Sequence, residues 1–133
     1  MNRSTALLLA VSLTLVLFTT SCATLTTSQI KNDPSRWMRI DHFGDTIVDQ
    51  KAKGYYPVNP SGALDGGTRL YRSDFASLQN NSILYFTVYG VLGDQFNTTS
   101  RAMKTAGYRL ASHQTFRDEH GRARHQATWT KQS

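Results

Sequence analysis

The chain has 133 residues, of which 39% are hydrophobic, and it contains six Tyr, six Phe and two Trp. This length suits one domain with a modest core, and the apolar content excludes wholesale disorder. Fifteen Lys and Arg against nine Asp and Glu give a formal net charge of +6.

The positive charge is concentrated in the C-terminal part of the chain. Residues 23–95 carry seven basic and seven acidic side chains, whereas residues 96–133 carry seven basic side chains against Asp118 and Glu119. An anionic partner such as nucleic acid, lipid headgroups or phosphorylated glycan would explain this asymmetry. A merely solvated basic face is the favoured explanation.

Residues 1–21 have the pattern of a signal peptide. Arg3 precedes an apolar run from Leu7 to Phe18, which is too short to span a bilayer comfortably. Thr19-Thr20-Ser21 then leads to Cys22. Small residues before a Cys resemble the lipobox of bacterial lipoproteins, although Thr19 stands where that pattern usually has Leu.

The lipobox resemblance implies that Cys22 is diacylated on sulfur and becomes the mature N-terminus. Ala23 follows it in place of the Asp that retains lipoproteins in the inner membrane, so the family rule implies the outer membrane of a Gram-negative host. Residues 22–34 would then be the lipidated Cys and a polar, flexible tether, with ordered structure starting after Pro34.

A second interpretation of the same stretch stays open. Ser21-Cys22-Ala23 also fits the small-x-small site of ordinary signal peptidase, which would leave a secreted soluble protein. Cys22 is the single Cys of the chain, which rules out an intramolecular disulfide and favours the lipobox.

The first half of the mature chain predicts strand, helix, strand and strand. Residues 36–41 form a short strand candidate, and the helix that follows is capped by Asp41 and ends at Gly54. Residues 55–59 read as an edge strand, because Pro57 and Pro60 cannot donate to a ladder. A turn is expected at 62–67, followed by a strand at 68–75.

The second half predicts the same order after a polar connection at 76–82. Residues 83–92 give the strongest strand signal and are apolar on both faces, which places them at the centre of a sheet. Asp94 caps a helix that Gly107 ends, and residues 108–116 and 122–131 form a final hairpin.

The two halves are an internal duplication. Seven residues between 41 and 65 recur 53 positions later, namely Asp41, Phe43, Thr46, Lys51, Gly54, Tyr55 and Asp65. After one inserted residue, Phe75 matches Trp129. We therefore predict one α+β domain over residues 35–133, with two βαββ repeats at about 36–78 and 83–131. They should form a largely antiparallel sheet with both helices packed on one face.

The second repeat also resembles small bacterial tandem-repeat modules. The resemblance rests on Gly107-Tyr108-Arg109-Leu110 and on Trp129-Thr130-Lys131, and the first repeat departs from both motifs. It implies a strand, helix and hairpin topology. Such modules have no single assigned activity, so the resemblance implies no chemistry.

No catalytic residue, metal ligand set or cofactor site is predicted. Ser112, His113 and Asp118 could suggest a nucleophile and its base, but neighbours on a strand point to opposite faces. The four His residues lack the spacing of a helical metal site, and one Cys is too few for structural zinc.

The final hairpin carries the candidate partner site. Strict alternation places Tyr108, Leu110 and Ser112 on one face, opposite Arg109, Ala111 and His113. On the returning strand it places His125, Ala127 and Trp129 inside and Arg122, Arg124, Gln126, Thr128 and Thr130 outside. Arg109, His113, Arg122 and Arg124 should then share a solvent-facing patch able to bind carboxylate or phosphate. His125 is expected to be a satisfied core residue.

These observations favour a non-enzymatic, lipid-anchored protein of the bacterial envelope that binds another envelope component. The partner could be a protein, an anionic glycan or a lipid. A small periplasmic hydrolase or inhibitor-like protein is the alternative. Nucleic acid is disfavoured, because an exported protein rarely meets it.

Overall fold

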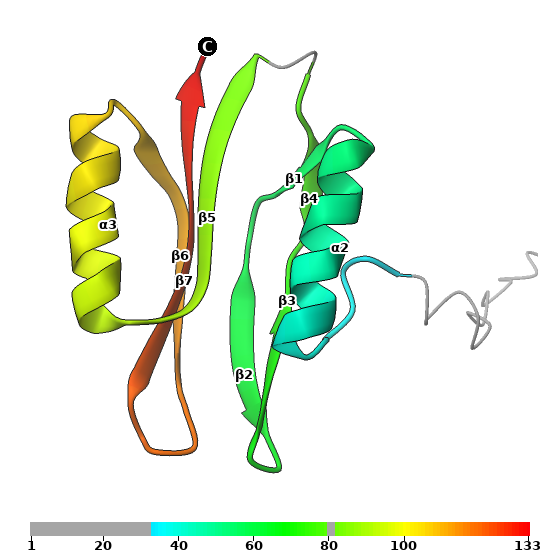
Figure 1. Cartoon of the computed structure of the whole chain (residues 1–133), viewed down its shortest axis with the longest axis vertical. Coiled ribbons are helices and arrows are strands. Elements are labelled where there is room, and N and C mark those ends of the chain that lie inside the picture. The colour runs from blue at the N-terminus through cyan, green and yellow to red at the C-terminus, as the bar shows by residue number, and fades with distance from the viewer. Residues whose placement is uncertain (1–32, 80–81) are drawn as a thin grey trace, which may run out of the picture.

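A computed structural model describes residues 33–79 and 82–133, and Figure 1 shows the arrangement of its elements. The signal peptide predicted at 1–21 and Cys22 lie outside the described residues. Neither described helix is long and apolar enough to cross a membrane. In chain order the elements are α2 (Ile40–Ala52), β1 (Tyr55–Pro57), β2 (Ser61–Asp65), β3 (Thr68–Arg72), β4 (Phe75–Ser77), β5 (Ile83–Leu92), α3 (Gly93–Thr105), β6 (Arg109–Arg117) and β7 (Ala123–Gln132).

The α+β class and the antiparallel pairing are confirmed. The strands divide among three small sheets, in the orders β1-β4, β2-β3 and β5-β7-β6, and every pair is antiparallel. In the first repeat the hairpin is interrupted between Pro57 and Ser61. Pro57 and Pro60 have no N–H to donate, so one continuous ladder cannot form there.

The two helices lie on opposite sides of the molecule rather than on one face of a single sheet (Figure 1). Helix α2 contacts β1 and β3 of its own repeat, and α3 contacts β5, β6 and β7. The second repeat's sheet has α3 on one face, while strand β2 of the first repeat packs against the strands of this sheet as well. Each helix therefore covers mainly the strands of its own repeat, and α2 also reaches the second repeat, where Phe43 contacts Tyr89 of β5.

The internal duplication is visible in the strand register. Met38 bridges Tyr71 in the first repeat, and Val91 pairs with His125 at the equivalent place in the second. The helices have 13 residues each. Gly54 and Gly107 follow them with φ of 85° and 86°, which confirms both as left-handed helix ends.

The helix starts differ from the prediction. Helix α2 begins at Ile40, so the strand expected at 36–41 is reduced to the single bridge at Met38. Asp41 and Asp94 lie inside the first helical turns, where a carboxylate suits the helix dipole. The N-cap residues are Arg39 and Leu92, and neither makes a side-chain capping bond.

Two strand predictions also need correction. Strand β5 has the predicted bounds but lies at the edge of its sheet, with β7 at the centre. Its second apolar face contacts the first repeat, which explains why it reads like a central strand. The turn predicted at 62–67 is confined to Gly66 and Gly67, with φ of 52° and 79°, and Gly62 to Asp65 belong to β2.

Two hydrophobic clusters form the core. Met38, Phe43 and Tyr71 are buried in the first, and Tyr89 and Phe116 of the second repeat pack on them. The second cluster lies between α3 and its sheet and consists of buried Val88, Ala127 and Trp129, with Val91, Phe96, Met103 and Tyr108 packed against it. The first cluster joins the two repeats, and the second holds α3.

A layer of buried polar side chains lies between the repeats. Gln126 and Thr128 are fully buried, although alternation had placed them on a solvent face. Gln114 Oε1 accepts hydrogen bonds from Gly62 N at 2.9 Å and from Gln126 Nε2 at 2.6 Å. Gln126 Oε1 accepts from Gly90 N at 2.9 Å. The first repeat covers this face, and the two side-chain amides form hydrogen bonds with each other and with backbone N–H groups there.

Candidate functional site

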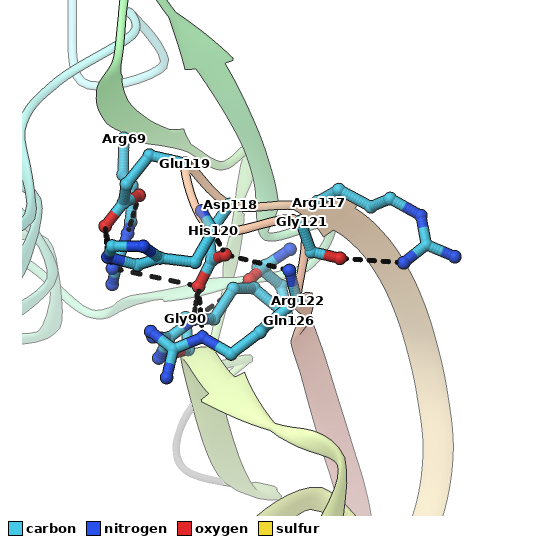
Figure 2. A network of polar contacts seen from close by, with 10 residues as sticks. Arg69, Gly90, Arg117, Asp118, Glu119, His120, Gly121, Arg122 and Gln126 are labelled. Carbon is cyan, nitrogen blue, oxygen red and sulfur yellow. Dashed lines mark hydrogen bonds and ion pairs between the residues drawn. The ribbon is translucent and has the colours of Figure 1, made fainter.

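The turn between β6 and β7 is built around the buried carboxylate of Asp118 (Figure 2). Asp118 Oδ2 accepts hydrogen bonds from Arg124 Nε at 2.7 Å and from Arg122 Nε at 3.3 Å. Asp118 Oδ1 accepts from the backbone N–H of His120 and of Arg122. Burial alone would raise the pKa of Asp118, but these hydrogen bonds outweigh it and hold the pKa well below its usual range.

Glu119 ties this turn to the first repeat. Arg69 of β3 donates from Nε to Glu119 Oε2 at 2.7 Å and makes a second ion-pair contact to Oε1 (Figure 2). This hydrogen bonding from Arg69 lowers the pKa of Glu119 to about 2. The paired geometry is the one in which guanidinium and carboxylate bind most strongly. Both acidic residues of the C-terminal basic region are therefore used in holding the fold together.

Two histidines lie under helix α3. His113 Nε2 and His125 Nδ1 share a hydrogen bond of 2.9 Å, and Thr115 Oγ1 lies 3.2 Å from His125 Nδ1. The ring of Phe96 stacks on both imidazoles, with centroids 4.3 Å from His113 and 4.8 Å from His125. Burial and the neighbouring His125 lower the pKa of His113. His125 is hydrogen-bonded, as predicted, but it is only half-buried and is therefore not a core residue.

The four residues of the predicted patch do not form one surface. Arg122 and Arg124 hold Asp118, and Arg124 also donates to Gly90 O at 2.9 Å. His113 faces α3, whereas Arg109 lies at the start of β6 on the other face. The reason is a register shift between Leu110 and Ser112, which reverses the alternation that the prediction assumed.

Arg109 instead borders two hollows at the start of β6, of which the first lies between this strand and α3. The first hollow measures about 380 Å³ and is lined by Ser100, Lys104, Tyr108, Arg109, Leu110 and Trp129. A second, of about 420 Å³, shares Arg109 and Leu110 and is lined further by Gly107, Ala111, Thr130, Lys131 and Gln132. We call these two adjoining hollows the basic groove.

The charge of the basic groove is uncompensated. Lys104, Arg109 and Lys131 line it, and none of the described lining residues is acidic. Lys131 Nζ donates to Ala106 O at 2.9 Å and lies 5.8 Å from the ring centroid of Tyr108. This fixes one ammonium group at the end of α3, where the helix dipole favours a cation.

The chain matches the model of a known protein family. The model of a family described as a polyglycine hydrolase-like structural repeat matches residues 41–73 and 82–132, which together make up more than half of the sequence. The chain belongs to this family of polyglycine hydrolase-like structural repeats. Comparisons with curated proteins and with solved structures find no match.

The two segments matched by the polyglycine hydrolase-like repeat coincide with the two repeats of the fold. The first runs from α2 into the end of β3, and the second from β5 to the end of β7. The predicted resemblance to tandem-repeat modules is thereby confirmed at the level of a repeat family. Both segments start after Cys22, so the lipobox stays a prediction.

The residues considered for catalysis are kept apart in this polyglycine hydrolase-like repeat domain. Ser112 and His113 pair with Thr128 and Ala127, which are consecutive on β7, so their side chains point to opposite faces. The carboxylate of Asp118 already accepts hydrogen bonds from Arg122 and Arg124. Within residues 33–79 and 82–133, no group of three or more His, Cys, Asp or Glu is placed to hold a metal.

Most groove residues were missed by reasoning from the sequence. The sequence marks Lys104 only as one position of the repeat, and Lys131 only as part of a Trp-x-Lys motif. One signal was present: Ser100 and Lys104 are four positions apart and so lie on one side of α3. That this side faces the start of β6 depends on how the chain turns at Gly107, which periodicity does not reveal.

Proposed function

We propose that this protein is a non-enzymatic, lipid-anchored component of the bacterial envelope whose repeat domain binds another, anionic envelope component through the basic groove. The anchor would be Cys22, acylated after removal of residues 1–21, and the outer membrane would be its location. The partner would be a protein or an anionic glycan or lipid. No cofactor takes part.

The observation that carries the binding proposal is the division of the arginines and lysines into two groups. Arg69, Arg122 and Arg124 each form an ion pair with Asp118 or Glu119. Among the described residues, Lys104 and Arg109 make no such ion pair, and they line a hollow beside the exposed Leu110. Uncompensated cations around an apolar contact are suited to recognition rather than to stability.

The anchor is supported by the sequence of the first 23 residues. A charged start, a short apolar core, small residues before the thiol and a single Cys are all features of a lipoprotein. A multiply acylated Cys holds a protein stably at a membrane, because each buried methylene adds about 0.8 kcal/mol.

Capture from detergent-solubilised envelopes tests the binding. Lys104→Glu combined with Arg109→Glu should reduce the captured partner by about tenfold or more, since opposite charge is replaced by like charge. Lys51→Glu combined with Lys53→Glu is the control for net charge, because both lysines are exposed at the end of α2 and the change in net charge is the same. Lys53 loses only an exposed ion pair with Asp49, which contributes little to stability. Equal capture by the groove variant and wild type would exclude the groove as the binding site.

Membrane fractionation tests the anchor. Wild type should be found in the outer membrane with an acylated N-terminal peptide starting at Cys22. Cys22→Ser should release the mature domain or leave an unprocessed precursor. An unmodified mature N-terminus at Thr24 in the wild type would show ordinary signal cleavage and refute the anchor.

A further inference from the structure

The geometry of the basic groove points to the class of its partner: we propose that it holds an extended, acidic segment of another polypeptide along the start of β6. This inference rests on the proposed function and names the chemistry of the partner at the same site.

The start of β6 is an open strand edge. β6 pairs with β7 alone, and Arg109, Leu110 and Ala111 are all exposed. An edge strand presents unpaired N–H and C=O groups that an extended chain can bind. The register shift after Leu110 limits this open edge to a few residues, so the bound segment is short.

The equivalent edge of the first repeat is closed. Pro57 stands at the position of Leu110, is buried, and accepts a hydrogen bond at its carbonyl from Thr128 Oγ1 at 3.0 Å. Pro57 also lacks an N–H for pairing. Of these two equivalent edges, only the one in the second repeat is open, and Lys104 and Arg109 lie beside it.

The two hollows match the geometry of an extended chain. The first contains Trp129 on the α3 side, and the second reaches Thr130, the next residue of β7, whose side chain points the other way. Leu110, 49% exposed, borders both. Successive side chains of an extended segment also point to opposite sides, so adjacent residues could enter different hollows.

The chemistry of the groove favours carboxylates on a polypeptide over a carboxylated glycan. Lys104 and Arg109 supply donors for carboxylates, and Leu110 supplies an aliphatic contact. A sugar ring would gain most from an exposed aromatic face, in addition to the charges. Trp129 is only 2% exposed, and Lys131 already lies over the ring of Tyr108.

Fluorescence anisotropy with the full-length protein in detergent tests this inference. The probe is a labelled peptide of about seven residues that alternates Glu and Val, a length typical of one strand. It should bind, and Lys104→Glu with Arg109→Glu should weaken it by about tenfold or more. Leu110→Asp should do the same without unfolding the protein, because Leu110 is exposed. Lys51→Glu with Lys53→Glu should leave binding unchanged.

Two further probes separate the possible results. Methylating alternate backbone nitrogens of the peptide should reduce affinity by about tenfold or more in one of the two registers, because those N–H groups pair with β6. Equal affinity of both methylated peptides would overturn strand addition. Groove-dependent binding of polygalacturonate or phosphatidylglycerol vesicles without peptide binding would overturn the polypeptide and keep the proposed function. No groove-dependent binding of any anionic probe would overturn both.

Discussion

The hairpin of the first repeat is broken into β1-β4 and β2-β3, whereas that of the second runs uninterrupted as β6-β7. The difference follows from two substitutions between the repeats. Pro57 and Pro60 of the first correspond to Leu110 and His113 of the second. Proline removes a ladder donor, so the first hairpin bends where the second continues with a register shift. Duplicated units can therefore share a plan and differ in which edges they expose.

The faces beneath the helices differ in a similar way. Tyr71 of the first repeat occupies the place of His125 in the second, and each stacks on the equivalent Phe of its helix. Tyr71 is fully buried beneath a covering that includes Phe116 of the other repeat. His125 has no such covering and hydrogen-bonds to His113. Helix α2 therefore lies on a fully buried aromatic residue, whereas α3 lies on a polar histidine pair that is partly open to solvent.

Asp118 and Asp65 are equivalent by sequence, and the structure gives them unequal roles. Asp118→Ala should cause the largest loss of stability among the substitutions proposed, because it leaves Arg124, mostly buried, without its carboxylate. Asp65→Ala should change little, since Asp65 is exposed. Urea unfolding followed by circular dichroism measures both. Similar losses of stability from the two variants would contradict the unequal roles of Asp118 and Asp65.

The same turn should make the protein sensitive to acid. The lowered pKa of Glu119 means that the folded state favours the carboxylate, so its contribution is complete above the ordinary value of 4.5 and is lost as pH falls towards about 2. Asp118, with its pKa also lowered, should lose its contribution at lower pH still. Glu119→Gln should flatten the stability profile between these limits, and an unchanged profile would exclude this role.

Trp129 and Phe75 are the equivalent aromatic residues of the two repeats. Trp129→Ala should cost about 3 to 5 kcal/mol of unfolding free energy, because a fully buried aromatic ring leaves a cavity. Phe75→Ala should cost less, since Phe75 is half-buried. Equilibrium unfolding in urea gives both values. A larger loss at Phe75 would show that the broken hairpin is the better packed of the two.

Gly54 and Gly107 test a feature that the two repeats share, namely the left-handed end of each helix. Val at either position should cost roughly 1 to 3 kcal/mol, because both glycines have positive φ and a β-branched residue is strained there. The two losses should agree closely. A cost confined to one position would show that the helix ends are not equivalent in solution.

The histidine pair should give the smallest effect, since His113 is exposed on one side and solvent screens it. Its lowered pKa means that the folded state favours neutral His113, so this contribution to stability is complete above the ordinary value of 6.5 and is lost as pH falls from there through the lowered pKa of the folded state. His113→Gln should reduce the slope of stability against pH just below 6.5. The first repeat has Pro60 and Tyr71 at these places and should supply no such slope. If the variant keeps the same slope of stability against pH, a group other than His113 causes it.

Several features were predictable because they depend on neighbours in sequence. The bounds of β5 follow from a run of apolar and β-branched residues, and the left-handed ends at Gly54 and Gly107 follow from local backbone freedom. The patch containing Arg109 and His113 was not predictable. The register shift after Leu110 places every later side chain of β6 on the face opposite to the one that strict alternation predicts.

The sequence by itself determined the duplication, the α+β class and the excess of positive charge in residues 96–133, because each is a property of residue identity and spacing. Only the tertiary structure decided which cations are free. The docking of the first repeat on the second buries Gln126 and Thr128 and pairs Arg69 with Glu119. The return of the chain after Gly107 gathers Lys104 and Arg109 at one groove. These are contacts between distant segments, which local patterns do not encode.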